Sequence, residues 1–387
     1  MAENLIVVGG GPVGLSFALA AAQNASLNVR LIESGVPLGS SQEEDFDHRV
    51  YALSPGSKAF LEALGAWQLL QRERIAPVTA MRIWGDDRVS ELEFEQRSPL
   101  AFIVENRALM AALWSLVRQQ QRILVHSPCT PAGLLRDDAR DCITLNLRQG
   151  GPIDAALVIG ADGANSWVRQ QAGLPVDAKS YESFGVVANF DCERSHDGVA
   201  RQWFATDSVL AWLPLPGARI SIVWSVSTER SESLLAMNRA EFANSVRAAG
   251  DESLGHLQCV SSVARFPLRR ILAEHCVAQH VALIGDAAHA IHPLAGQGVN
   301  LGFADARLLS GLLAECSLLH SIGDLLLLRK YERGRKESVM ALATLTDQLK
   351  SLFAHPAKSI VGLRNAGLAF ADKQAWLKRR LMQYAMQ

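Results

Sequence analysis

Three glycines near the start of the chain have a spacing that suits the binding of a phosphate group. Gly9, Gly11 and Gly14 follow a short apolar run, residues 5–8, and open a helix-like segment of small and apolar residues, 13–22. In such a unit the first glycine permits a tight turn, the second lets a pyrophosphate approach the backbone, and the third allows close packing of helix and strand. The free N–H groups and the positive end of the helix dipole would then hold the anion.

An acidic residue at the end of the next apolar run completes this pattern. Residues 29–32 form the run, and Glu33 follows it, nineteen residues after Gly14. In dinucleotide sites a carboxylate at this point binds a ribose hydroxyl. We therefore predict a dinucleotide-binding unit whose helix begins at Val13.

A second group of candidate residues lies in the last third of the chain. Gly285 and Asp286 follow a predicted strand, 281–284. A glycine-rich loop, 292–300, then leads into a helix that begins near Asn300. The nucleotide-binding pattern thus returns late in the chain.

Two arginines and an acidic turn lie where an anionic ligand would bind. Arg49 follows a polar stretch, 34–47, that is too long for an ordinary connection and must cross the ligand face. Arg107 is expected in the first turn of a helix, where its charge is unfavourable unless an anion lies nearby. Asp162-Gly163 forms a turn into another helix. The alternatives are a solvated charge for Arg49 and a helix cap for Asp162.

The composition excludes several classes of protein. With 38 basic and 39 acidic residues the net charge is −1, so the basic footprint of a nucleic-acid-binding protein is missing. The six cysteines form no CxxC pair, which indicates buried thiols in a reducing compartment. His289 and His292 are spaced as HxxH, but a helix-borne metal pair would stand at i and i+4, and we expect no metal.

The apolar segments are short. No stretch reaches about eighteen uninterrupted apolar residues, and the start of the chain lacks the basic region of a signal peptide. We therefore expect a soluble, cytoplasmic protein that could rest on a membrane surface.

The middle of the chain has a different character from its two ends. Residues 180–265 are rich in β-forming residues and include Trp203, Trp212 and Trp224. We expect an α/β fold: a Rossmann-like domain, an inserted and mostly antiparallel β-sheet domain, and a helical C-terminus. The tryptophans are expected in the core more often than in the wall of a substrate pocket.

Taken together, these motifs resemble a known family. Gly9-x-Gly11-x-x-Gly14, Asp162-Gly163, and Gly285-Asp286 followed by HPLAGQGVNLGFAD are similar to the FAD-dependent aromatic monooxygenases of the para-hydroxybenzoate hydroxylase class. Within that class the AGQGVNLG string resembles the ubiquinone-biosynthesis hydroxylases, as do RVYALS and ENRALM. The likeness covers essentially the whole chain. One departure is Tyr51, where the family often has a smaller aliphatic residue.

The resemblance implies a division into domains. FAD-binding segments alternate with segments of the substrate domain, and helices follow. The expected ranges are 1–75, 106–179 and 271–320 for the three parts of the FAD-binding domain, 76–105 and 180–270 for the substrate domain, and 321–387 for the C-terminal helices.

The resemblance also implies the role of each site residue. Glu33 would bind the adenosine ribose and Asp286 the ribityl or pyrophosphate region, with Arg49 and Arg107 on the flavin side. The Asp162-Gly163 turn is linked in the family to both FAD and NAD(P)H. The other implied FAD contacts are Gly9, Gly11, Pro12, Val13, Gly14, Gly285, Pro293, Gly296, Gly298, Val299 and Asn300. The flavin ring would be bordered by His292, Pro293, Gly296, Gln297 and Gly298.

The chemistry implied by the resemblance belongs to the flavin. NAD(P)H would reduce FAD, O2 would add to the reduced ring to give a flavin hydroperoxide, and the aromatic ring of a prenylated phenol would be hydroxylated. Because that intermediate decays in water, the inserted sheet is expected to keep the site dry. The helix start near Gly298 would stabilise negative charge on the reduced ring. No catalytic side chain and no essential cysteine are expected.

Two other functions agree with the same residues. One is a monooxygenase for a small soluble phenol, and the other is a catalytically silent flavoprotein subunit of a biosynthetic complex. A flavin-dependent halogenase is disfavoured because its WxWxIP stretch is missing. The basic stretch 378–380 is either a solvated face or a contact with a membrane or with other ubiquinone-biosynthesis proteins.

Overall fold

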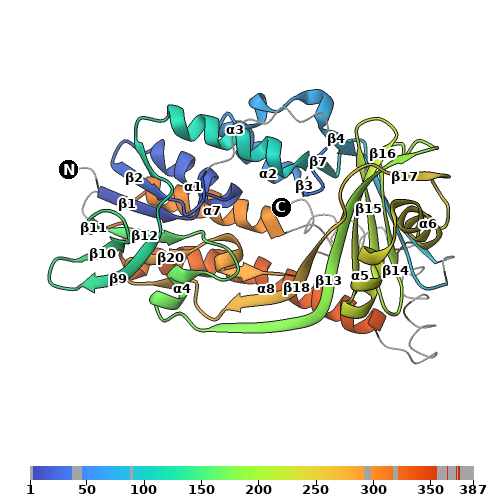
Figure 1. Cartoon of the computed structure of the whole chain (residues 1–387). Coiled ribbons are helices and arrows are strands. Elements are labelled where there is room, and N and C mark those ends of the chain that lie inside the picture. Colours follow the sequence, from blue (N-terminus) through green and yellow to red (C-terminus); the bar gives the residue numbers. More distant parts are fainter. Residues whose placement is uncertain are drawn as a thin grey trace.

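A computed structural model of the chain describes residues 3–36, 46–87, 90–291, 298–316, 321–354, 364, 372 and 374. Two large sheets organise these residues (Figure 1). A parallel sheet with its helices lies on the left of the view, and a mostly antiparallel sheet lies on the right. The long strands β13 (Val176–Cys192) and β18 (Ala264–Ala273) connect the two. This arrangement confirms the predicted fold class.

The parallel sheet has the order β19-β20-β12-β1-β2-β8. Its strands run parallel except β19, which pairs antiparallel with β20. The strands are β1 (Glu3–Val8), β2 (Leu27–Ile32), β8 (Ile123–His126), β12 (Leu157–Gly160), β19 (Val277–Ala278) and β20 (Val281–Leu283).

The central strand β1 is apolar on both faces because both faces are covered. Leu5 and Val7 join a core with helices α1, α3 and α7, whereas Ile6 and Val8 join a core on the opposite face. A strand buried on both faces appears in the sequence as an unbroken apolar run. The elements on the two faces are α1 (Pro12–Ala22), α3 (Asn106–Gln119), α7 (Gly298–Ala314), β9 (Pro131–Asp137), β10 (Cys142–Leu147), β11 (Ile153–Ala155) and α4 (Trp167–Gln171).

The large sheet has the order β21-β18-β13-β16-β15-β14-β5-β6, with β17 also paired to β13. Neighbouring strands are antiparallel except β14 and β5. Two helices, α5 and α6, pack on one of its faces. The further elements are β5 (Ala80–Trp84), β6 (Glu91–Glu95), β14 (Val199–Phe204), β15 (Val209–Leu215), β16 (Arg219–Ser227), α5 (Thr228–Ala236), α6 (Arg239–Ala249), β17 (Leu257–Cys259) and β21 (His289–Ala290).

A small sheet with the order β3-β7-β4 lies where the two large sheets meet. Helix α2 follows β3, and its start has two common features of a helix N-terminus: the Ser54 side chain caps the first turn, and Pro55 is the first helical residue. A short 3-10 turn follows it. These elements are β3 (Val50–Leu53), α2 (Pro55–Ala63), η1 (Trp67–Leu69), η2 (Arg72–Arg74), β4 (Ala76–Val78) and β7 (Ala101–Glu105).

Helix α8 (Leu325–Ala354) runs along the lower side of the molecule from the parallel sheet toward the large sheet (Figure 1). Its middle packs against the residues that flank the glycine-rich loop, since Val339 and Ala343 contact Ile291 and Leu301. Its end reaches the large sheet, where Phe353 packs on Phe204. None of the helices in the described ranges combines the length and the apolar character needed to span a bilayer.

Candidate functional site

The turn between β1 and α1 requires glycine at two positions. Gly9 has a φ of +112°, and a Cβ atom on it would lie 2.3 Å from the carbonyl oxygen of Ala161. A Cβ atom on Gly14 would lie 2.1 Å from the carbonyl oxygen of Gly9. Both contacts are too short for real atoms, so the turn, the helix and β12 come this close only because side chains are missing.

Gly11 differs from these two because it faces open space. A Cβ atom there would meet no atom within 4 Å, although its backbone has an ordinary extended conformation. Gly11 is the N-cap of α1, Pro12 is the first helical residue, and no side chain caps the helix. The first-turn N–H groups lack an intrahelical acceptor by helix geometry. Unoccupied space and positive charge therefore coincide, and the turn fits the pyrophosphate of FAD.

Glu33 lies beside this turn, at the end of β2. One carboxylate oxygen, Oε2, accepts a hydrogen bond from the Gly10 N–H at 2.6 Å. The other, Oε1, accepts from the Gly35 N–H at 2.6 Å. A carboxylate has further lone pairs, so Glu33 can hold a ribose hydroxyl while it also ties the turn to the loop after β2.

The Gly285-Asp286 segment forms a 3-10 turn, η3 (Gly285–Ala287), that closes on the start of α1. Gly285 has a φ of +60° and lies against the Val13 side chain. A Cβ atom on Gly302 of α7 would lie 2.5 Å from Cγ2 of the same valine. Val13 therefore packs between two glycines, which lets the starts of α1 and α7 approach each other. Gly302 belongs to the VNLGFAD string but was not among the predicted site residues.

Asp286 lies near Arg49, within range of its charge. Solvent reaches its side chain, yet protein atoms crowd around it, and this crowding raises the pKa of the carboxyl group. The neighbouring residues His289, Arg49 and Arg269 act in the opposite direction and lower this pKa. The structure thus brings together Asp286 and Arg49, which are far apart in the sequence and which the resemblance assigns to one cofactor.

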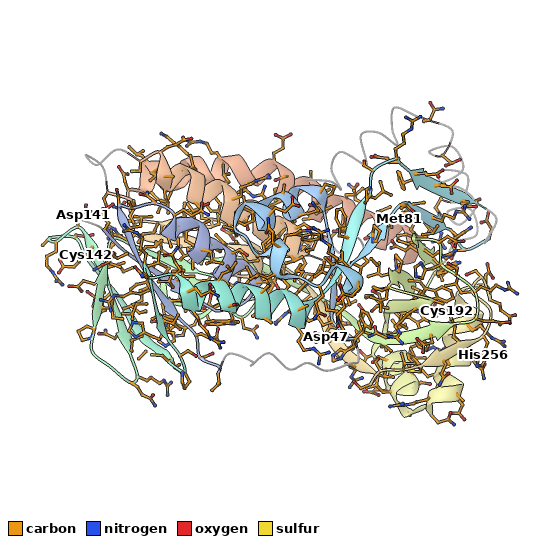
Figure 2. The ribbon with its side chains drawn as sticks, turned by 90° about the horizontal axis from the view of Figure 1, so that it is seen from above. Asp47, Met81, Asp141, Cys142, Cys192 and His256 are labelled. Atoms are coloured by element: carbon orange, nitrogen blue, oxygen red, sulfur yellow. The ribbon has the colours of Figure 1, made fainter. Side chains whose placement is uncertain are left out.

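Arg49 and Arg107 are joined through a residue that the sequence analysis did not single out. The Asp47 carboxylate accepts hydrogen bonds from the Arg49 N–H through Oδ1 at 3.0 Å and from the Arg107 N–H through Oδ2 at 3.1 Å. Figure 2 shows Asp47 where α3 meets the large sheet. Its negative charge lies at the start of α3, so an anion of the protein itself offsets the unfavourable position of Arg107.

Tyr51 and Asn106 complete this part of the site. The Arg49 guanidinium lies 5.6 Å from the centre of the Tyr51 ring. The Tyr51 hydroxyl donates to Oδ1 of Asn106 at 2.9 Å, and burial raises its pKa. Asn106 is the first residue of α3, and Glu105 before it is the N-cap residue.

Asn300 has its side chain fully engaged with the protein. Its Nδ2 donates to the Ala52 carbonyl at 2.9 Å, and its Oδ1 accepts from the Ser54 N–H and the Ser57 hydroxyl at 2.9 and 2.7 Å. This buried amide fixes the start of α7 to the start of α2.

Asp162 uses its carboxylate to cap α4. It accepts from the Ser166 hydroxyl at 2.5 Å and from the N–H groups of Trp167 and Val168 at 2.7 and 3.0 Å. The buried Arg169 then donates to the carbonyls of Ala164 and Ala287 at 2.9 and 2.8 Å, which ties this turn to η3. Asp162 therefore acts as a cap of the helix that follows it, as the alternative interpretation predicted. Gly163, with a φ of +79°, provides the turn.

His289 is part of a buried polar network. Its Nε2 lies 2.7 Å from Oδ2 of Asp305, which also accepts from the Gly285 N–H at 2.9 Å. Among the described residues no group of three or more His, Cys, Asp and Glu side chains is placed to hold a metal ion. All six cysteines are free thiols.

Some predicted residues lie outside the described ranges. They are His292, Pro293, Gly296 and Gln297 of the glycine-rich loop, and the basic stretch 378–380. The next two residues of the predicted site, Gly298 and Val299, are described. Gly298 also borders open space. Val299 packs against the hydrophobic core that β1 forms with helices α1, α3 and α7.

The tryptophans of the large sheet belong to its core. Trp203, Trp212 and Trp224 are buried on the face that α5 and α6 cover. The ring of Trp212 meets that of Trp203 edge to face, at 4.8 Å between centroids. The interpretation of these residues as core is confirmed, and they do not form the wall that faces the FAD-binding half.

The other face of the large sheet is turned toward the candidate site. On β16, Ser221, Val223 and Ser225 alternate with the core residues, and the register pairs them with Leu213, Ala211 and Val209 of β15. Leu213 packs against the small sheet. On β13, Asn189 donates from Nδ2 to the carbonyls of Phe46 and Asp47, both at 3.1 Å. Small and apolar side chains therefore line the space beside Asp47.

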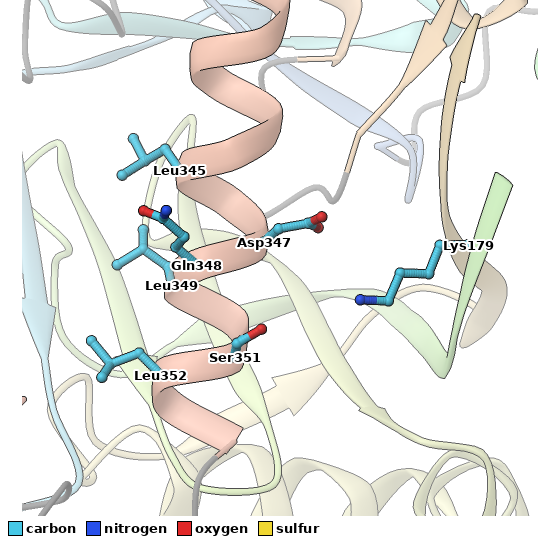
Figure 3. A pocket seen from close by; sticks show the side chains of 7 residues that line it. All are labelled: Lys179, Leu345, Asp347, Gln348, Leu349, Ser351 and Leu352. Carbon is cyan, nitrogen blue, oxygen red and sulfur yellow. The ribbon is translucent and has the colours of Figure 1, made fainter. Parts of the chain in front are cut away.

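A groove of about 660 Å³ lies along the end of α8 (Figure 3). Leu345, Leu349 and Leu352 lie on one side of the helix, and Asp347 lies on the side that faces Lys179 of β13. The Asp347 carboxylate accepts from Nη1 of Arg270 at 2.6 Å and from the Tyr181 hydroxyl. This groove does not include the glycine turn or Asp286.

Comparisons with known proteins agree with this geometry. The FAD binding domain family matches residues 2–346 of the chain. The 3-demethoxyubiquinol 3-hydroxylase of Escherichia coli is 34% identical over 387 residues, which cover 99% of this chain and 98% of that protein. The ubiquinone hydroxylase UbiL of Rhodospirillum rubrum is 30% identical over 99% of this chain and 89% of its own. The p-nitrophenol 4-monooxygenase PnpA of Pseudomonas putida shares the fold, with a TM-score of 0.76, 18% identity, and coverage of 100% of this chain and 98% of that one.

Proposed function

Because the chain belongs to the FAD binding domain family of flavin-dependent aromatic-ring monooxygenases, we propose that it hydroxylates the ring of a prenylated phenol in ubiquinone biosynthesis. FAD is its cofactor, and NAD(P)H and O2 are its co-substrates. The observation that carries the proposal is the uncapped start of α1 at Gly11, which opens onto unfilled space beside Glu33 and η3.

The residues that would hold FAD come from separate parts of the chain. The α1 turn would bind the pyrophosphate, Glu33 the adenosine ribose, and Asp286 the adjoining chain of the cofactor. Arg49 and Arg107 would lie on the flavin side, next to the start of α7. When bound, FAD supplies hydride acceptance and oxygen activation, and the protein supplies position and surroundings.

The large sheet would supply the substrate wall. Val187, Ala211 and Val223 are cross-strand neighbours on the face turned toward the site. Their apolar surface would pack on an aromatic ring and exclude water. The leucines along α8 offer a further apolar surface for a prenyl tail.

The test is substrate-stimulated oxidation of NAD(P)H by the purified, FAD-loaded protein, with mass spectrometry of the product. We expect a prenylated phenol to stimulate oxidation and to gain one oxygen atom. A small phenol that reacts equally well would favour the small-substrate alternative. No hydroxylated product from either would leave the silent-subunit alternative.

A variant of the proposed wall makes the test sharper. Val223→Trp should fill the space above the sheet, so FAD content stays normal while turnover of the prenylated phenol is lost. Val176→Trp, at an exposed valine of the same sheet, is the matched control and should keep turnover. Normal turnover in Val223→Trp would contradict the assignment of the wall.

A further inference from the structure

We infer that Asp47 is a positioning residue that holds Arg49 and Arg107 in one arrangement on the flavin side of the site. The inference rests on the proposed FAD site and adds a residue to it. Asp47 would act through the two arginines and would not itself touch the cofactor.

The first support is the division of one carboxylate between two distant backbone groups. Oδ1 accepts from the Arg49 N–H at 3.0 Å and Oδ2 from the Arg107 N–H at 3.1 Å. The Asn106 N–H in turn donates to the Arg49 carbonyl at 2.9 Å. These three bonds fix the backbones of both arginines relative to each other. The Cα atoms from which the two side chains extend are therefore held in place before a ligand binds. Preorganisation of this kind lowers the ordering cost of binding.

The second support is that Asp47 is itself held rigidly. Its N–H donates at 2.7 Å to Oε1 of Glu105, a residue that is only 3% exposed. Glu105 also forms a two-pronged ion pair with Arg74, at 2.7 and 2.9 Å. From the opposite side, Asn189 of the large sheet donates to the Asp47 carbonyl at 3.1 Å. Both halves of the molecule therefore determine where this carboxylate lies.

The third support is electrostatic. The Asp47 carboxylate lies at the start of α3, where the positive end of the helix dipole favours negative charge. The backbone of Glu105 caps this helix without any side-chain bond, so Asp47 caps it from another part of the chain.

The test compares FAD affinity in matched variants. We would titrate apoprotein with FAD, follow the quenching of flavin fluorescence, and record urea unfolding of each apoprotein. Asp47→Ala should weaken FAD binding by about tenfold or more, because both backbone bonds are lost. Asp47→Asn keeps one acceptor oxygen, so its FAD affinity should lie between those of wild type and Asp47→Ala. If Asp47→Ala does not fold, Asp47→Asn is compared with wild type instead. The control is Asp137→Ala, since Asp137 also accepts two backbone bonds, from Ala139 and Arg140 at 3.1 Å, in a hairpin remote from the site.

A double-mutant cycle separates positioning from general stability. If Asp47 acts through the arginines, its removal should change FAD affinity less than about twofold in an Arg49→Ala/Arg107→Ala background. An equal loss of affinity in both backgrounds, or unchanged affinity in Asp47→Ala and Asp47→Asn, would overturn the inference. Wild-type apoprotein that takes up no FAD would instead overturn the proposed function.

Discussion

Arg335 of α8 donates from Nε to Oδ1 of Asp305 in α7 at 2.6 Å, and this contact fastens the last long helix to the helix that begins at the candidate site. Asp305 has no exposed surface, and Arg335 is 12% exposed. The other oxygen of Asp305 binds the Gly285 N–H and His289. A fully buried charge is thus satisfied by three donors, one of which belongs to the proposed cofactor turn.

Removing the arginine should destabilise the fold strongly. Arg335→Met removes the ion-pair partner of Oδ1 of the buried Asp305 carboxylate, and we expect the free energy of unfolding to fall by about 3 kcal/mol or more. Urea denaturation of the apoprotein at pH 7 measures this loss. The control is Arg333→Met, on the exposed side of the same helix, which should change stability by less than about 0.5 kcal/mol. Equal losses of unfolding free energy in both variants would show that the Arg335–Asp305 contact makes no specific contribution to stability.

The same pair predicts a dependence on pH. Burial acts to raise the pKa of Asp305, but His289 and Arg335 outweigh burial, and the pKa lies below its usual 3.8. A lowered carboxyl pKa contributes stability above pH 3.8 that is lost as the pH falls through the folded value. The difference in stability between wild type and Arg335→Met should therefore shrink below about pH 4. Acid titrations followed by circular dichroism would measure it, and a constant difference from pH 7 to pH 3 would contradict the explanation.

The glycines of the first turn should divide into two classes. Gly11→Val projects into open space, so we expect a folded protein that is purified without FAD. Gly14→Ala places Cβ 2.1 Å from a backbone oxygen, so we expect lower stability of the fold itself. Flavin absorbance and melting temperature, measured on both variants, distinguish the classes. Normal flavin content in Gly11→Val would refute the pyrophosphate assignment.

Asp286 should favour cofactor binding at the expense of stability. Its pKa is raised by crowding, so the stabilisation of its protonated form is present below pH 3.8 and lost as the pH rises through the folded value. At pH 7 the ionised carboxylate is therefore unfavourable for the apoprotein. We expect Asp286→Ala to be purified without FAD and to resist urea at least as well as wild-type apoprotein at pH 7. A less stable apoprotein with normal flavin content would contradict both assignments.

The sequence by itself determined the local elements and the family. The Gly9 to Gly14 turn and the apolar strand before Gly285 depend on residues only a few positions apart, so their spacing is visible in the chain. The same holds for the Asp162 cap, which was foreseen as an alternative because the groups that donate to its carboxylate follow it closely in the chain.

Only the tertiary structure decided which distant residues act together. Asp47 and Arg107 are sixty positions apart and Asp305 and Arg335 thirty, and no periodic pattern links residues at such distances. Alternation along β16 shows that successive side chains point to opposite faces, but it does not show which face α5 and α6 cover. Hydrogen bonds and packing between elements form only when the chain folds. They determine both which distant residues contact each other and which face of the sheet is covered.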